Sequence, residues 1–251
     1  MWNTPSRHYG GRHLKGEDNR RFLLIGNSRW HWAIEQADCW HFLHTAPDPQ
    51  TIESLKIPLI SWAAVGHIPK EIVLNPCKRL EIKDIPLKQL PAWLGIDRAL
   101  GGWGALKKAE SAGIHSAGLL VADAGTILSL TRITANGEFA GGQLIPGLNL
   151  QLSAMANGTK NLNNPGPAST NSSQFPFTTA EAMQRGVLQS LIGALIEAVK
   201  ETNMPLWLCG GDAPLLMKEL KKRNINAFHH PNLVLEAMVD IHRQINQEQD
   251  L

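Results

Sequence analysis

Apolar and polar positions along the chain divide it into short strand-like runs and longer segments with helical spacing. The runs at residues 22–25, 30–34, 59–65, 118–123, 127–133 and 206–209 are typical of β-strands. Helical spacing predicts helices over 97–109, from 148, from Thr178 or Thr179 to about 201, from near Asp212, and over 231–247. Prolines spread between residues 69 and 91 exclude a long helix there. The pattern therefore predicts an α/β fold.

Two of the predicted strands end in a glycine turn, about a hundred residues apart. Strand 22–25 runs into Gly26-Asn27-Ser28, and strand 118–123 is followed by Gly125-Thr126. Glycine lets the backbone turn sharply and direct its N–H groups at an anion, so both hairpins are predicted to bind phosphate. The second hairpin also carries Asp123, a carboxylate suited to the magnesium that accompanies a nucleotide phosphate. The first has Leu24 at the corresponding place.

Composition limits the class of protein. The 251 residues are 43% apolar, which is enough for one large or two modest domains with buried cores. A net charge of +2 gives no excess that would favour nucleic-acid binding, so any polyanion that binds should be small. Three widely spaced cysteines are typical of buried thiols in a reducing compartment. The chain shows neither a membrane-spanning run nor a signal peptide, and we expect a cytoplasmic protein with no membrane partner.

The elements form two consecutive α/β halves, each opening with a glycine hairpin, and a late junction of strand, Gly210-Gly211 and helix. This order resembles the actin-like, or acetate and sugar kinase, superfamily. The resemblance implies two tandem actin-like (RNase H-like) halves, over residues 22–117 and 118–251, with a nucleotide cleft between them. Residues 1–21 are polar and glycine-containing, which predicts a flexible N-terminal extension.

A closer resemblance covers about residues 22–240. The segments 95–98 (Gly-Ile-Asp-Arg), 123–126 (Asp-Ala-Gly-Thr) and 141–147 (Gly-Gly-Gln-Leu-Ile-Pro-Gly) look like successive signatures of type III pantothenate kinase. Further matches follow in the family's order, at residues 26–28, 159, 179–186, 210–212 and 233–236. The resemblance implies ATP-dependent phosphorylation of pantothenate, the first step of coenzyme A synthesis. It also implies a homodimer that needs Mg²⁺ and a monovalent cation, K⁺ or NH₄⁺.

Asp97 and Asp123 are the residues expected to carry the chemistry. Phosphoryl transfer to an alcohol needs a group that accepts the hydroxyl proton, and Asp97 is the candidate, although an aspartate there could equally cap a helix. Gly95 permits close approach of the substrate, and the Arg98 fork suits a carboxylate such as that of pantothenate. Asp123 is expected to hold magnesium, with a simple turn aspartate as the alternative.

The remaining motifs are assigned to nucleotide and substrate contacts. Gly125 and Thr126 are expected to donate to phosphate oxygens, and Gly210 and Gly211 to lie against adenine or ribose. Thr179, like Thr159, could bind the pantothenate amide or hydroxyl groups, or could cap a helix. Residues 141–142 and 146–147 are expected to shape the pantothenate wall. His229-His230 is assigned to a loop and not to zinc, and Gly102-Trp103-Gly104 lacks the third glycine of a dinucleotide fingerprint.

Two departures from the family pattern leave other functions open. Leu24 replaces the aspartate usual in the first hairpin and cannot bind a cation. The tyrosine usual before the Gly-x-Asp-Arg signature is also missing, and its place is near Lys88. One alternative is therefore an accessory or regulatory protein of the same fold that binds nucleotide or pantothenate. Another is a kinase of the superfamily that acts on a sugar or a short acid, although the signature at residues 141–147 speaks against it.

Overall fold

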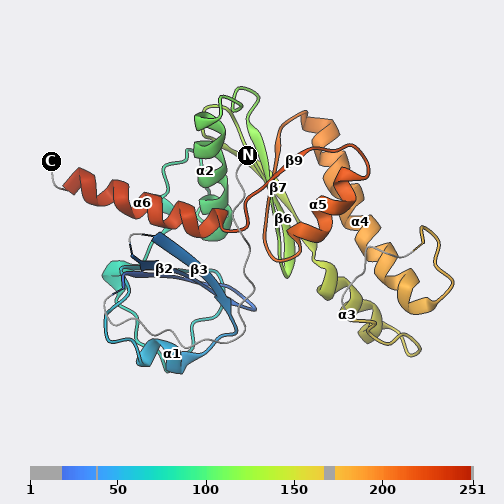
Figure 1. The fold of residues 1–251 in the computed structure, drawn as a ribbon, viewed down its shortest axis with the longest axis horizontal. Helices are drawn as coiled ribbons and strands as arrows, with labels where there is room; N and C mark the ends of the chain where they lie inside the picture. The colour runs from blue at the N-terminus through green and yellow to red at the C-terminus, as the bar shows by residue number, and fades with distance from the viewer. Residues whose placement is uncertain (1–18, 38, 167–172, 250–251) are drawn as a thin grey trace.

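The computed structural model describes residues 19–37, 39–166 and 173–249. Most of the predicted N-terminal extension, residues 1–21, and part of the predicted loop between 157 and 174 lie outside the described residues. Two mixed β-sheets organise the chain, with helices beside and between them (Figure 1). Within the described residues, no helix is both long and apolar enough to span a bilayer.

The first sheet has the strand order β3-β2-β1-β4. Strands β1 (Arg21–Ile25) and β2 (Trp30–Gln36) form the predicted antiparallel hairpin, and β4 (Ser61–Ala64) lies parallel to β1. Strand β3 (Cys39–Thr45) pairs with β2 at the edge and leads to the short helix α1 (Pro49–Glu53). These last two elements were not predicted. Two histidines and the lack of any fully buried position give β3 only a weak apolar pattern.

The second sheet has the strand order β7-β6-β5-β8-β9. Strands β5 (Leu119–Ala124) and β6 (Ile127–Ile133) form the second predicted hairpin, and β8 (Leu206–Cys209) runs parallel to β5. The edge strands β7 (Phe139–Pro146) and β9 (Ala227–His229) were not predicted. His229 therefore ends a strand, whereas the sequence placed it in a loop, and His230 stacks on Trp207.

The predicted helices are confirmed, with small shifts at their ends. They are α2 (Ile96–Ser111), α3 (Leu148–Gly158), α4 (Thr179–Thr202), α5 (Ala213–Lys221) and α6 (Leu233–Gln249). Thr178 caps α4, because its hydroxyl accepts from the backbone N–H of Glu181. The proline-rich stretch holds only the 3₁₀ turns η1 (Pro76–Lys78) and η2 (Ile82–Asp84).

The core is layered, because side chains on the central strands alternate between opposite faces. Phe22 and Leu24 of β1 face α2 and α6, while Leu23 and Ile25 face α1. On β5, one set of side chains joins the same α2–α6 core, and the other packs under α4 and α5. Helices α2 and α6 therefore lie between the two sheets (Figure 1).

The C-terminal helix returns to the first sheet. Helix α6 packs against β1, β2 and α2, although its sequence belongs to the predicted second half. The division into halves after residue 117 stays a prediction.

Gly102-Trp103-Gly104, which lacked a complete dinucleotide fingerprint, lies inside the buried part of α2. A β-carbon on Gly104 would come within 3.0 Å of the Ala237 side chain and 3.1 Å of the Leu233 carbonyl oxygen. The glycine thus lets α6 approach α2 closely, which is a packing role.

Glu219 of α5 is a buried carboxylate held by three cations. Its side chain is only 1% exposed and lies 2.5 Å from Lys222 Nζ, 2.9 Å from Arg223 Nη1 and 3.4 Å from Arg185 Nη1. Burial opposes ionisation, but the hydrogen bonds and charges of Lys222 and Arg223 outweigh it and hold the pKa of Glu219 below its usual value. Since Arg185 belongs to α4, this cluster joins α4 to α5.

We predict that Glu219→Gln lowers the free energy of unfolding by about 3 kcal/mol at neutral pH, because it removes the buried counter-charge of three cations, of which Arg185 is itself largely buried. The native pKa is depressed, so this stabilisation is complete above the unfolded-state pKa and is lost as pH falls through the native pKa. Denaturant unfolding should therefore show wild type and variant converging in acid. Glu110→Gln, which breaks an exposed pair with Lys107, is the control and should change stability by less than about 1 kcal/mol. Equal effects of the two substitutions would contradict the prediction.

Candidate active site

The two predicted phosphate hairpins meet in space. Each turn is closed by its own backbone, from Gly26 N–H to the Arg29 carbonyl (3.0 Å) and from Gly125 N–H to the Ile127 carbonyl (3.2 Å). Ser28 Oγ then lies 2.9 Å from Thr126 Oγ1, across 98 residues of sequence. The tips of both hairpins therefore line one site between the two sheets.

Asp123 is held at the end of β5, beside the second hairpin. Burial and, to a smaller extent, charge repulsion from the nearby Asp97 carboxylate together raise the pKa of Asp123 to about 7. The Cys209 thiol donates a hydrogen bond to Asp123, from the paired position on β8. Gly210 has a φ of +89°, and a β-carbon there would come within 2.5 Å of Asp123 Oδ1. The β8–α5 junction thus forms a close-fitting cradle for this carboxylate.

Asp97 lies in the first turn of α2, at the other side of the site. Its Oδ1 accepts a 2.8 Å hydrogen bond from the backbone N–H of Arg98, in the manner of a helix-terminal aspartate. Burial nevertheless raises the pKa of Asp97, the N–H bond opposing it. A β-carbon on Gly95 would come within 2.5 Å of Asp97 Oδ1, so the glycine leaves space for the carboxylate. The position of Asp97 is therefore compatible with both alternatives, a catalytic base and a helix cap.

Arg98 anchors the start of α2 to the second sheet. Its Nε donates to Thr131 Oγ1 (3.1 Å) and its Nη2 to the Leu130 carbonyl (3.3 Å), while the guanidinium lies 5.9 Å from the Phe139 ring centroid. Gly142 leaves the room that this arrangement needs, because its β-carbon would fall 2.4 Å from Arg98 Nη2. The predicted contact of Arg98 with substrate stays a prediction.

Leu24 is buried in the core shared with α2 and is only 5% exposed. The first hairpin therefore offers backbone groups and the Ser28 hydroxyl, but no carboxylate at this position. Among the described residues, no group of three or more His, Cys, Asp or Glu side chains is arranged to hold a metal ion. Asp97 and Asp123 remain as the acidic pair of the site.

Two further predicted segments lie against the second hairpin. The Gly147 N–H donates to the Thr126 carbonyl (2.9 Å), so the end of β7 forms a wall beside this turn. Gly210 and Gly211 precede α5, and the Asp212 N–H donates to the Ala124 carbonyl (2.9 Å). Asp212 is the N-cap of α5, as predicted.

In the described part of the chain, no contact links Thr159 or Thr179 to this site. Thr159 ends α3 and its hydroxyl donates to the Met155 carbonyl (2.9 Å). Thr179 is the exposed first residue of α4, next to the capping Thr178. Its role in substrate binding stays a prediction.

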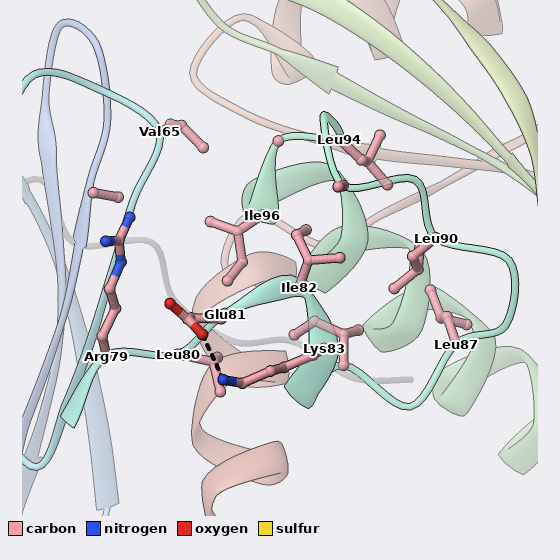
Figure 2. A pocket seen from close by; sticks show the side chains of 14 residues that line it. Val65, Arg79, Leu80, Glu81, Ile82, Lys83, Leu87, Leu90, Leu94 and Ile96 are labelled. Atoms are coloured by element: carbon pink, nitrogen blue, oxygen red, sulfur yellow. Dashed lines mark ion pairs between the residues drawn. The ribbon is translucent and has the colours of Figure 1, made fainter. Parts of the chain in front are cut away.

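A cavity of about 710 Å³ opens beside the start of α2, between the end of β4 and the segment 79–96. In Figure 2, Val65 and Arg79 lie on one wall, with Ile82, Leu87 and Leu90 on the other. Its lining includes Gly95, whose β-carbon would fall 3.7 Å from Val65 Cγ1 as well as against Asp97. The cavity therefore reaches the residues that surround the Asp97 carboxylate.

Sequence reasoning missed this cavity and Cys209. The cavity is built by the proline-spaced segment, whose irregular backbone has no periodic pattern. Cys209 gave only the signal of a buried thiol, because its contact with Asp123 follows from the β5–β8 register.

Comparison with known proteins identifies the family. Residues 67–201 match the family model for type III pantothenate kinase. The type III pantothenate kinase of Synechococcus elongatus is 31% identical over 225 residues, covering 80% of this chain and 88% of the relative. The enzyme of that name from Thermosynechococcus vestitus is 32% identical and covers 82% of each chain. The chain belongs to the type III pantothenate kinase family.

Solved structures support the actin-like fold of this type III pantothenate kinase family member. A structure described as a conserved putative Baf family transcriptional activator from Campylobacter jejuni aligns with a TM-score of 0.59 at 20% identity, over 92% of this chain and all of the other. A putative 2-dehydro-3-deoxygalactonokinase from Sinorhizobium meliloti aligns with a TM-score of 0.57 at 13% identity, over 90% and 96%. The predicted α/β fold of actin-like type, with two mixed sheets, is confirmed.

We predict that the Ser28–Thr126 contact stabilises the meeting of the hairpins. A double-mutant cycle with Ser28→Ala and Thr126→Ala, measured by unfolding free energy, should give a coupling of about 0.5–1 kcal/mol. Ser28→Ala combined with Ser111→Ala, which removes a bond to Lys107 on the outside of α2, should be additive. Additivity of the Ser28 and Thr126 substitutions would show that the hydroxyls do not interact in solution.

Proposed function

We propose that this chain transfers the γ-phosphoryl group of ATP to pantothenate, giving 4′-phosphopantothenate at the start of coenzyme A synthesis. The observation that carries the proposal is the contact between Ser28 and Thr126, which joins two glycine hairpins at one site beside Asp97 and Asp123. Membership of the type III pantothenate kinase family supplies the substrate pair. We place this activity in the cytoplasm.

The phosphates of ATP would lie between the two hairpins. The Gly26 and Gly125 N–H groups close their own turns, so the donors left for phosphate are the backbone N–H groups of Asn27, Ser28 and Thr126, with the two hydroxyls. Gly26 and Gly125 contribute the sharp turns that bring these donors together. Gly210 and Gly211 leave the backbone open to the nucleoside at the β8–α5 junction. Binding at both hairpins fixes the terminal phosphate relative to the acceptor, and positioning is the main contribution in phosphoryl transfer.

Asp97 would accept the proton of the pantothenate hydroxyl. Burial raises its pKa, which makes the carboxylate a better base than an exposed aspartate, and the Arg98 N–H holds one oxygen in place. The cavity beside Gly95 has a volume in the usual range for small-molecule sites and would receive the acceptor. Gly95, Arg98 and Thr179 are the residues that we assign to acceptor binding.

The acidic pair fits a magnesium ion. Asp97 and Asp123 are oxygen donors. Burial raises the pKa of both, and the charge of Asp97 further contributes to the raised pKa of Asp123. Magnesium commonly takes one or two carboxylates and completes its shell with water and substrate phosphates, so a larger protein cluster is not required. Bound there through Asp123, it would neutralise charge on the phosphates. We propose a need for K⁺ or NH₄⁺ from family membership alone.

Two alternatives have less support. An accessory protein of the same fold would explain the absence of a carboxylate at Leu24. It would not explain why Asp97 and Asp123 lie at one site, or why the β8–α5 junction packs closely around Asp123. A kinase for a sugar or short acid is not favoured, since the relatives that match most of this chain are type III pantothenate kinases.

We also propose that the chain forms a homodimer. Large apolar side chains are exposed on β7, on α3 and on the segment before α4, namely Leu144, Leu150, Met155, Phe175 and Phe177. Helices α3 and α4 pack against each other, and exposed apolar side chains of this size are typical of a surface that another protein covers.

We predict that light scattering coupled to size exclusion will give the mass of a dimer for the wild-type chain. Phe177→Ser should shift the population toward monomer, because it places a polar group on the proposed interface. Val73→Ser, at a residue that is 92% exposed in a different part of the chain, is the control and should leave the mass unchanged. A monomeric wild-type chain would refute the dimer without bearing on the kinase activity.

Asp97→Asn provides the test of the catalytic role. With ATP, Mg²⁺ and K⁺ or NH₄⁺ present, wild type should convert pantothenate to 4′-phosphopantothenate, identified by mass spectrometry. The variant should lose about 10²–10⁴-fold in kcat and still bind ADP, because it retains the shape of the side chain but not the base. Asp240→Asn, on the exposed side of α6, should retain full activity. Wild-type kcat in Asp97→Asn would remove Asp97 from the mechanism, and absence of product from wild type would overturn the proposed function.

A further inference from the structure

Two histidines of the first sheet form a pair on the face that meets the second sheet. His31 of β2 lies directly across from Leu24 of β1 and from His44 of β3. Residues paired across antiparallel strands put their side chains on the same face. Leu24 belongs to the core shared with α2, so the two histidines face this side as well. Their Nδ1 atoms are 2.7 Å apart, which requires that one ring donates to the other.

The first phosphate hairpin lies directly beside His31. A β-carbon on Gly26 would fall 3.1 Å from His31 Nε2, so the imidazole fills the space that a side chain at this glycine would need. Within the described residues no protein group hydrogen-bonds to Nε2, and this atom is not one of the buried polar atoms that lack a partner. Solvent therefore reaches Nε2, and the ring presents an available polar atom at the base of the hairpin.

A chain of hydrogen bonds fixes which nitrogen of each ring carries the proton. Desolvation lowers the pKa of His31 to about 4, with smaller contributions from the charges of His44 and Arg29. Desolvation also lowers the pKa of His44, so both rings are neutral at neutral pH. A hydrogen bond with the Asn232 side chain opposes the shift of His44, and a bond that favours the protonated ring is one in which the ring donates. Because His44 Nδ1 faces His31, the nitrogen that donates to Asn232 is Nε2.

This order of bonds leaves His31 Nε2 as an acceptor. A neutral imidazole has one N–H and one lone pair. With the proton of His44 on Nε2, its Nδ1 accepts, and the N–H between the two rings is that of His31 Nδ1. The lone pair of His31 is then on Nε2. Asn232 lies immediately before α6, which packs against β1 and β2, so the same bonds join the hairpin to the helix between the sheets.

An accepting nitrogen at this place suits a water molecule on a cation better than a phosphate. Phosphate oxygens carry lone pairs and repel a lone pair on Nε2, whereas water bound to a cation is a strong hydrogen-bond donor. Magnesium keeps several of its waters in protein sites. Asp123, proposed to hold the ion, lies on the face of β5 that carries Val121, and Val121 shares a core with Leu24. His31 and Asp123 therefore lie on the two sheet faces that meet at this site.

We propose that His31 Nε2 accepts a hydrogen bond from a water molecule of the magnesium ion that accompanies the nucleotide. The first hairpin, where Leu24 offers no carboxylate, thus holds the ion through its water shell, while Asp123 holds it from the second hairpin. His44 and Asn232 are positioning residues that fix the imidazole in the accepting tautomer. The inference rests on the proposed function, because it takes the nucleotide and magnesium to bind between the hairpins.

The first test measures how much magnesium tightens nucleotide binding. Calorimetry gives the dissociation constant of a non-hydrolysable ATP analogue with Mg²⁺ and with EDTA, for wild type, His31→Phe, His31→Gln and His41→Phe. We expect His31→Phe to reduce the gain from Mg²⁺ about ten-fold without changing the affinity in EDTA. His31→Gln, whose amide oxygen can accept, should recover part of the gain. His41→Phe, at an exposed histidine paired with Ile34 on the opposite face of the sheet, is the control and should match wild type.

Nitrogen-15 NMR of histidine-labelled protein tests the tautomer directly. The wild-type chain should show His31 as a neutral ring with its proton on Nδ1. The Nε2 signal should move when the analogue and Mg²⁺ are added together, and the analogue with EDTA should leave it in place. A proton on Nε2, or an equal shift without Mg²⁺, would overturn the inference.

The inference also fails if His31→Phe weakens binding equally with Mg²⁺ and with EDTA, if it has no effect, or if Mg²⁺ does not tighten binding to wild type. Product formation is measured separately and decides the proposed function. A magnesium gain that depends on His31 without formation of 4′-phosphopantothenate would support the inference and reject the kinase. Phosphorylation of pantothenate with no effect of His31→Phe on the magnesium gain would do the reverse.

Discussion

Burial of α2 between the two sheets is the constraint on which the site depends. The helix is apolar on most of its circumference, and it packs against α6, β5 and β6, while its first turn carries Asp97. A helix enclosed in this way cannot shift without opening cavities on several sides at once. Arg98 adds a polar tie to β6 at the end where Asp97 lies. The candidate base is therefore carried by one of the best-fixed parts of the molecule.

Asp97 and Asp123 lie in surroundings that disfavour their charged forms. Burial disfavours the charged form of both carboxylates and raises the pKa of Asp97 and of Asp123, and for Asp123 the charge of Asp97 adds to this effect. Cys209 and Gly210 hold Asp123 in position without neutralising it. The magnesium proposed for this site would offset the burial of the two carboxylates and accompany the nucleotide phosphates.

Much of the fold followed from local patterns. The hairpins at 26–28 and 125–126, the strand entering Gly210-Gly211, and the helices α2, α4 and α6 each combine apolar periodicity with a glycine or a cap, and all are present. The edge strands β3, β7 and β9 were not predicted from the sequence. An edge strand pairs with only one other strand and buries fewer side chains, so its apolar pattern is weak. The site residues Asp97 and Asp123 came from motif resemblance. Thr179 came from the same source, and no described contact brings it to the cleft.

The sequence by itself determined which segments turn, which are buried, and where carboxylates and glycines stand next to each other in the chain. These are local properties, set by backbone preference and hydrophobic period. Only the tertiary structure decided that Ser28 meets Thr126, that Cys209 lies opposite Asp123, and that Arg79 shares a cavity with Gly95. Contacts of this kind depend on strand order and on how α2 and α6 pack between the sheets. No short-range pattern encodes them, because the free energy that selects them comes from burial summed over the whole core.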